Sequence, residues 1–235
     1  NYPTTQGSPG LREAIVAWLK RRFNLQHINS DTEVLPVNGS REALFAIAQA
    51  VIDASLPEPV VVCPNPFYQI YEGAALLACA VPHFLNILPQ NNFMLEFGQL
   101  DESIWRRAQL VYVCSPGNPS GSVMTINEWE ELFRLADKHG FVIASDECYS
   151  ELYFDEHTPS LGGLEAAQRL GRSRYPRLIV FNSLSKRSNV PGMRSGFVAG
   201  ERTIIEKFHL YRTYHGCAMS PPVQAASIAA WSDEA

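Results

Sequence analysis

The chain has 235 residues, of which 46% are hydrophobic and 18% charged, with a formal net charge of −5. This composition suits one sizeable buried core and excludes the strongly basic surface of a nucleic-acid groove or of a binder of anionic membranes. No apolar run is long enough to cross a bilayer, and the opening residues NYPTTQGSPG lack the basic start and apolar core of a signal peptide. We therefore expect a soluble, cytoplasmic protein.

Apolar residues at helical spacing alternate with short apolar runs along the chain. In chain order, helices are expected over residues 9–23, 41–53, 68–79 and 127–139, with a last helix beginning near residue 223. The runs VVVC, LVYVC, FVIAS, LIVF and FVAG lie between them, and most are followed by a turn-rich segment. This alternation predicts an α/β fold with a mostly parallel central sheet flanked by helices, a three-layer αβα arrangement.

Cysteines occur five times without a CxxC pair, at positions 63, 79, 114, 148 and 217. Three of them stand in or at the end of apolar runs, which predicts buried free thiols in a reducing compartment. The dispersed histidines and cysteines show no ligand spacing, so we expect no metal site.

Lys186 is the first residue that points to chemistry, in the segment NSLSKRSNVPGMRSG after the run RLIVF. Ser183 and Ser185 offer hydroxyls, Arg187 adds positive charge, and Arg194 follows a Pro-Gly turn. A solvated loop lysine is the ordinary alternative. The cluster instead predicts an anion pocket beside an amine. Nearby positive charge favours the neutral form of that amine, and a nucleophile that forms a Schiff base must be neutral.

Segments along nearly the whole chain resemble, in the same order, the class I/II aminotransferases, which are pyridoxal-phosphate (PLP) enzymes of fold type I. They are NYPTTQGSPGLREAI at 1–15, PNPFYQIY at 64–71, SPGNPSG at 115–121, SDECYSELYF at 145–154, and SLSK followed by PGMRSG. The resemblance implies the PLP-binding large domain of that fold over residues 1–235, with Lys186 as the lysine that holds the cofactor.

The resemblance also assigns the groups around the pyridine ring. PLP withdraws electrons only while its ring nitrogen is protonated, and a buried carboxylate keeps that proton in place. Asp146 matches this acid, and Glu147 is its rival. Asn118 and Tyr149 match the donors to the phenolic oxygen of PLP. Asp146 and Tyr149 therefore join Lys186 as the expected catalytic residues.

Ring stacking and phosphate binding need other residue types. Tyr68 matches the aromatic side chain that stacks on the pyridine, with Phe67 or Tyr71 as alternatives. A glycine before a helix start makes an anion site, and arginine adds a two-donor contact to phosphate. The residues expected at the phosphate are Gly39, Ser40, Arg41, Ser183, Ser185 and Arg194. Tyr2 matches a tyrosine that reaches the phosphate of the neighbouring subunit, which implies a homodimer.

Two segments, SLSKRSNVPGMRSGFVAG and YRTYHGCAMSPPVQAAS, resemble more closely the bacterial succinyldiaminopimelate aminotransferases. This resemblance implies small-molecule substrates: an amino group would pass between glutamate and N-succinyl-2-amino-6-oxopimelate in lysine biosynthesis. The alternatives are another fold type I enzyme, such as an aminotransferase of different substrate or a carbon–sulfur lyase, and a PLP-sensing domain of a transcription regulator.

The family also has a small domain built from both chain ends and an arginine near the C-terminus that clamps the substrate carboxylate. No segment of this chain matches them. We therefore expect the chain to be a fragment that corresponds to the large domain. If a residue inside this chain binds the substrate carboxylate instead, Arg12 and Arg212 are the candidates.

Overall fold

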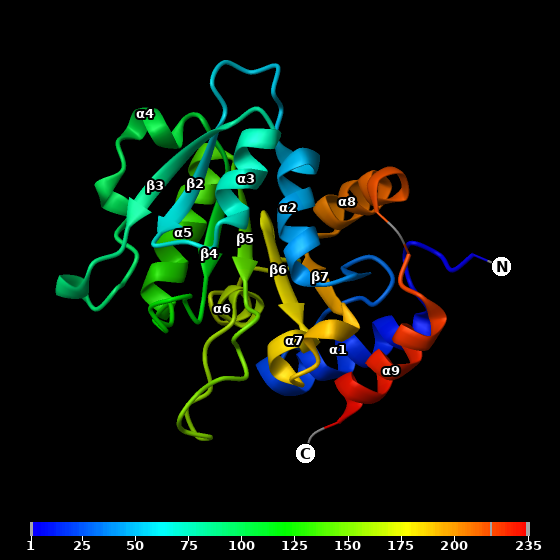
Figure 1. Ribbon diagram of the computed structural model, residues 1–235. Coiled ribbons are helices and arrows are strands. Elements are labelled where there is room, and N and C mark those ends of the chain that lie inside the picture. Colours follow the sequence, from blue (N-terminus) through cyan, green and yellow to red (C-terminus); the bar gives the residue numbers. More distant parts are fainter. Residues whose placement is uncertain (1, 217, 234–235) are drawn as a thin grey trace.

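One sheet of seven strands forms the centre of the computed structural model, which describes residues 2–216 and 218–233 (Figure 1). Its strand order is β1-β7-β6-β5-β4-β2-β3. The strands are β1 (Val34–Val37), β2 (Val60–Asn65), β3 (Val81–Asn86), β4 (Ala108–Cys114), β5 (Val142–Asp146), β6 (Leu178–Ser183) and β7 (Gly196–Gly200). All neighbouring pairs are parallel except those that involve β7, which runs antiparallel to both β1 and β6. The predicted, mostly parallel sheet is confirmed.

Helices cover both faces of this sheet. They are α1 (Pro9–Phe23), α2 (Ser40–Val51), α3 (Ile70–Leu77), α4 (Glu102–Trp105), α5 (Ile126–His139), α6 (Gly163–Arg169), α7 (Leu184–Arg187), α8 (Arg202–His215) and α9 (Pro221–Ser232). Three single 3-10 turns are η1 (Pro89–Asn91), η2 (Phe97–Gln99) and η3 (Pro191–Met193).

Alternate residues of each strand divide the hydrophobic core into two layers. In β4, Val111 and Val113 pack with α1, α5, α6 and α9, whereas Leu110 and Tyr112 pack with α2, α3 and α8. Successive side chains of a strand point to opposite faces, so a strand that is apolar throughout supplies both layers. The predicted three-layer αβα arrangement is therefore confirmed.

Six strands and helices were not predicted from the sequence: β1, β3, α4, α6, α7 and α8. Strand β3 lies at the sheet edge, contains Pro82 and exposes Val81, so it lacks a continuous apolar run. Helix α8 buries only Ile205, Phe208 and Arg212, a spacing that is helical but sparse.

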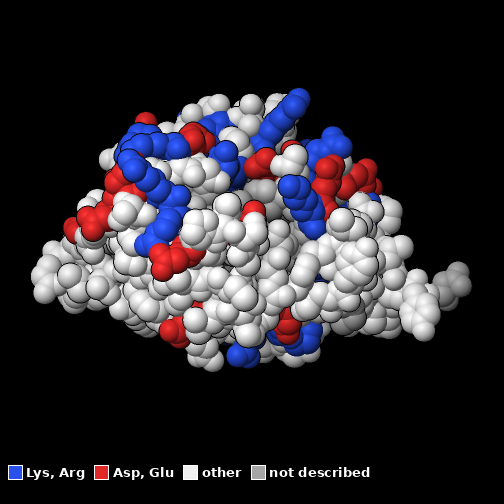
Figure 2. All heavy atoms as spheres, turned by 90° about the horizontal axis from the view of Figure 1, so that it is seen from above, with Lys and Arg blue, Asp and Glu red and all other residues white. Residues whose placement is uncertain are grey.

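The molecular surface carries mixed charges at one end of the sheet (Figure 2), and the described cysteines are free thiols. Figure 2 shows the end at which the parallel strands begin, where basic and acidic side chains are interspersed. Cys63 is buried, Cys114 and Cys148 are partly buried and Cys79 is exposed, all as free thiols, while Cys217 lies outside the described residues. Within the described ranges, no helix has the length and apolar character needed to cross a membrane.

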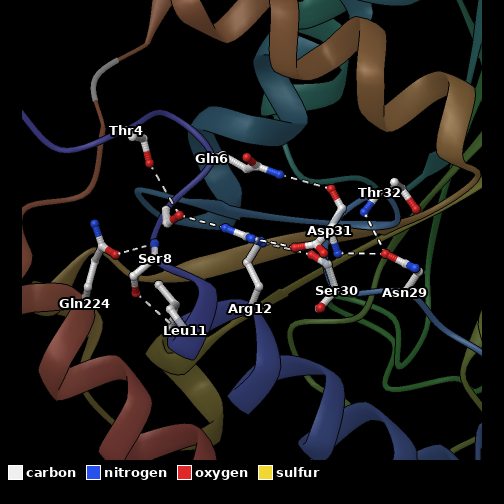
Figure 3. A network of polar contacts seen from close by, with 11 residues as sticks. Thr4, Gln6, Ser8, Leu11, Arg12, Asn29, Ser30, Asp31, Thr32 and Gln224 are labelled. Atoms are coloured by element: carbon white, nitrogen blue, oxygen red, sulfur yellow. Dashed lines mark hydrogen bonds and ion pairs between the residues drawn. The ribbon is translucent and has the colours of Figure 1, made fainter.

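Arg12 ties the N-terminal segment to the sheet (Figure 3). Its guanidinium is buried and donates to the carbonyl oxygens of Gly7 at 2.8 Å and Ser30 at 2.9 Å, and to Asp31 Oδ1 at 2.7 Å. One side chain of α1 thus holds both the turn before its own helix and the loop that leads into β1. Each nitrogen of the guanidinium thus has a protein acceptor within this junction.

We expect Arg12→Ala to lower the free energy of unfolding by about 2–3 kcal/mol, because two carbonyl groups lose their donor and a buried volume is left empty. Chemical denaturation measures this loss. Asp31→Asn is the control: the Asp31 side chain is 70% exposed, so this change should cost less than about 1 kcal/mol. Equal effects of the two changes would contradict a structural role for the buried guanidinium.

Candidate active site

The candidate site is a cavity of about 530 Å³ at the edge where neighbouring parallel strands end. Asp146 is the last residue of β5 and Ser183 is the last residue of β6. Asn118 follows β4, and Tyr68 follows β2. The cavity is lined by Ser40, Arg41, Glu42, Tyr68, Asn118, Asp146, Cys148, Tyr149, Ser183, Ser185, Lys186, Pro191 and Arg194. The lining includes every residue predicted to contact a cofactor except Gly39 and Tyr2. Glu42, Cys148 and Pro191 were not predicted.

Asp146 is a buried carboxylate with two protein donors. The hydroxyl of Tyr71 donates to Oδ2 at 2.8 Å, and the backbone N–H of Cys148 donates to Oδ1 at 3.3 Å. Burial raises the pKa of Asp146, and hydrogen bonds from Cys148 and Tyr71 oppose that rise. The structure thus brings the predicted ring-nitrogen acid to the cavity and adds Tyr71 as its support, a role that sequence reasoning missed.

Glu147 faces the opposite layer. Its Oε1 accepts hydrogen bonds from the hydroxyl of Ser145 at 2.9 Å and the backbone N–H of Gly163 at 2.7 Å. Burial raises the pKa of this carboxyl to about 7. Because adjacent residues at the end of a strand point to opposite sides, only Asp146 of the two acids reaches the cavity.

Lys186 lies in α7, with Nζ 5.9 Å from the centroid of the Tyr149 ring. Burial raises the pKa of Tyr149, so its hydroxyl keeps its proton and can donate at neutral pH. Ser183 is the N-cap of α7, and its Oγ accepts from the backbone N–H of Ser185 at 3.0 Å. Both serines line the cavity beside Lys186.

Arg187 does not add its charge to the cavity as expected. Its Nη1 donates to the carbonyl of Ala230 at 2.6 Å, and its guanidinium lies 5.6 Å from the Trp18 ring and 5.3 Å from the Trp231 ring. Arg187 therefore fastens α7 to α9 and α1 instead.

Arg194 lines the cavity near the start of α2, and its guanidinium lies over Gly39, which is not itself a lining residue. Gly39 precedes the helix with a φ of +98°, and a Cβ built on it would lie 2.1 Å from Nη2 of Arg194. Only glycine therefore lets this guanidinium lie over the helix start. Nη2 donates to Glu42 Oε2 at 2.8 Å, and Nη1 donates to the carbonyl of Pro191 at 3.1 Å.

The structure separates the three aromatic candidates. Tyr68 lines the cavity, with the Arg41 guanidinium 5.9 Å from its ring centroid. Phe67 stacks on Phe84 at 5.0 Å, and Tyr71 is fully buried beneath Asp146. Of the three, only Tyr68 is placed to face a planar ligand in this cavity.

Tyr2 lies outside the cavity and is fully exposed on the extended N-terminal segment (Figure 1). Arg212 also lies outside the cavity, buried within α8 with its guanidinium 5.9 Å from the Phe208 ring. Among the residues that the structure describes, no cluster of three or more His, Cys, Asp or Glu could hold a metal ion.

The comparisons with known proteins agree with this geometry. Residues 1–235 match the family model of aminotransferase class I and II over their whole length. The chain belongs to this family. Its members are PLP-dependent, so the cofactor predicted from the sequence is confirmed at the level of the family.

Individual relatives match 97% or more of this chain, whereas the chain spans less than two thirds of their length. The LL-diaminopimelate aminotransferase of Dehalococcoides mccartyi is 31% identical over 97% of this chain and 56% of its own length. A crystal structure of an aminotransferase from Neisseria meningitidis is 57% identical, with a TM-score of 0.95, over 100% of this chain and 59% of that protein. Aminotransferase AspB from Helicobacter pylori is 38% identical, with a TM-score of 0.91, over 99% of this chain and 60% of that protein.

The residues in the cavity fit PLP chemically. A buried carboxylate suits a protonated ring nitrogen, and a primary amine suits an aldehyde. Because Gly39 has no Cβ, the Arg194 guanidinium can lie at the start of α2. A guanidinium beside a helix N-terminus favours the binding of a phosphate. The cavity volume of about 530 Å³ also lies in the range of small-molecule sites.

The raised pKa of Glu147 predicts a pH-dependent stability. The folded chain keeps a proton that the unfolded chain releases between pH 4.5 and about 7, so the stability contributed by this group falls as the pH rises through that window. We expect Glu147→Gln, which cannot ionise, to gain about 2–3 kcal/mol over the wild type between pH 5 and pH 8. Urea unfolding at both pH values measures the gain. Exposed Glu206→Gln is the control, and a matching pH response in that variant would refute the assignment.

Proposed function

We propose that this chain is the PLP-binding large domain of a transaminase. The observation that carries the proposal is the convergence of three groups on one cavity: the amine of Lys186, the buried carboxylate of Asp146 and the guanidinium of Arg194. An amine, an acid and an anion binder in one hollow match the aldehyde, the ring nitrogen and the phosphate of one cofactor.

Each residue has a role that follows from its position. Asp146 would hold a proton on the ring nitrogen, and Tyr71 would fix the orientation of that carboxylate. Asn118 and Tyr149 would donate to the phenolic oxygen. Lys186 would hold the cofactor covalently and, when free, carry a proton at Nζ to or from the substrate α-carbon. Bound PLP supplies an electron sink for bonds at that carbon.

The remaining lining residues would bind and orient. Tyr68 would stack on the ring, since it is an aromatic residue that lines the cavity. Residues at the start of α2, the two serines at the start of α7 and the arginine after η3 would surround the phosphate. These residues are Gly39, Ser40, Arg41, Ser183, Ser185 and Arg194.

For the substrate, we propose transamination between glutamate or 2-oxoglutarate and N-succinyl-2-amino-6-oxopimelate, in diaminopimelate and lysine biosynthesis. The support is the likeness of the segments around Lys186 and at 211–227 to enzymes of that activity. The second candidate is LL-diaminopimelate itself, because the relative from Dehalococcoides mccartyi carries that name. The corresponding amino donors, N-succinyl-LL-2,6-diaminopimelate and LL-2,6-diaminopimelate, differ by one succinyl group on the distal nitrogen.

A homodimer with shared sites is part of the proposal. Tyr2 is fully exposed and borders no part of its own cavity, so a contact with phosphate would require the cavity of a second copy. Helix α3 also exposes Leu76 and Leu77, which are 57% and 67% accessible and would be covered in an association. We place the protein in the cytoplasm, where free thiols such as Cys79 persist.

Borohydride reduction after incubation with PLP tests the cofactor assignment. We expect a pyridoxyl group on the peptide that contains Lys186 and none in Lys186→Ala, because Lys186 is the only lysine of the described residues that lines the cavity with Asp146. Exposed Lys207 on α8 provides the control, since Lys207→Ala should be labelled like the wild type. Labelling of another lysine at stoichiometric yield would contradict the assignment.

Release of 2-oxoglutarate from glutamate by the PLP-loaded enzyme tests transamination. The preferred substrate is identified by comparing kcat/KM for N-succinyl-LL-2,6-diaminopimelate and for LL-2,6-diaminopimelate as amino donors. We expect kcat/KM for the succinylated donor to be at least tenfold higher, which corresponds to about 1.4 kcal/mol. The reverse preference would favour the second candidate. Pyruvate release from sulfur amino acids without transamination would favour a lyase.

A further inference from the structure

Glu42 is a cavity residue to which the proposed function assigns no role. It is the third residue of α2, and its Oε2 accepts from Nη2 of Arg194 at 2.8 Å. Both side chains are about half exposed, Glu42 at 48% and Arg194 at 43%, so the pair stands at the opening of the cavity.

The ion pair occupies the space over Gly39. A Cβ at Gly39 would lie 2.1 Å from Nη2 of Arg194 and 3.0 Å from Oε2 of Glu42, so both charged ends meet directly above this residue. An anion that enters along the axis of α2 would therefore approach the carboxylate of Glu42 as well as the guanidinium. The two negative groups would compete for the same Nη2 donor.

The other charged residues that line the cavity leave Glu42 as the carboxylate that competes with a phosphate for Arg194. Three cations line it, Arg41, Lys186 and Arg194, against two acids, Glu42 and Asp146. Asp146 is already held by Tyr71 and the Cys148 backbone, 2.8 Å and 3.3 Å from its oxygens. Glu42 is thus the acid on the phosphate side, and a phosphate ester brings a charge between about −1.5 and −2 at neutral pH.

We propose that Glu42 is an internal stand-in for phosphate: it holds the Arg194 guanidinium when the cofactor is absent and weakens cofactor binding by competing for it. The inference rests on the proposed function, because it takes the phosphate of PLP as the competing anion. A half-exposed ion pair is weak, so the phosphate can displace the carboxylate, but the carboxylate remains nearby as a like charge.

The test is equilibrium binding at low ionic strength with wild type, Glu42→Gln and Glu42→Ala. Gln keeps an oxygen acceptor for Arg194 and loses the charge, whereas Ala loses both. The matched control is Glu206→Gln, because Glu206 also pairs with an arginine on a helix surface and is 50% exposed. The ligands are PLP, inorganic phosphate and pyridoxal, which has the ring and aldehyde but no phosphate.

We expect both Glu42 variants to bind PLP and inorganic phosphate roughly three- to tenfold more tightly than the wild type. Pyridoxal affinity should be unchanged, and Glu206→Gln should match the wild type with every ligand. Unchanged phosphate affinity in Glu42→Gln would overturn the proposal. Weaker binding in Glu42→Ala with wild-type binding in Glu42→Gln would also overturn it, because Glu42 would then support Arg194 instead of competing with phosphate.

Calorimetry with inorganic phosphate separates this inference from the proposed function. If the wild type takes up no PLP at Lys186, the proposed function fails, while the phosphate titration still compares Glu42→Gln with the wild type. If the wild type takes up PLP and the variants bind both anions with wild-type affinity, only the role of Glu42 fails.

Discussion

The burial of the Asp146 carboxylate is the constraint on which the rest of the site depends. A carboxylate taken out of water needs donors that replace its lost hydration. Tyr71 and the backbone of Cys148 supply them, and Tyr71 belongs to the helix that follows β2. Satisfying one acid therefore ties the end of β5 to the segment after β2, across the intervening β4. That tie also places Tyr68, three residues before Tyr71, at the same cavity.

Regular apolar spacing made much of this fold predictable. The helix expected over 9–23 is α1 (Pro9–Phe23), and that over 127–139 differs from α5 (Ile126–His139) by one residue. The site was accessible to sequence reasoning for a related reason. Parallel strands bring all their carboxyl ends to one edge of the sheet. A polar residue directly after an apolar run, such as Asp146, can therefore be expected to lie near the polar residues that follow the other strands.

The features that could not be predicted depend on contacts between distant segments. No local sequence pattern indicates which side of β5 faces the cavity, so the sequence alone could not distinguish Asp146 from Glu147 as the acid at the ring nitrogen. Arg187 follows Lys186 directly, yet it packs on α9, which begins 34 residues later. The run FVAG likewise does not indicate that β7 pairs antiparallel with both β1 and β6.

Gly39 shows how a position can be intolerant of change without any chemistry of its own. It has no side chain, and its φ of +98° is one that other residues rarely adopt. Any larger residue would also displace the guanidinium above it. In a saturation mutagenesis experiment, such a site would be as depleted of variants as Lys186, although it donates no functional group. Sensitivity to mutation at Gly39 would therefore reflect the space that the Arg194 guanidinium requires. A map of positions that tolerate no substitution would include residues that make room for this arginine as well as the catalytic residues.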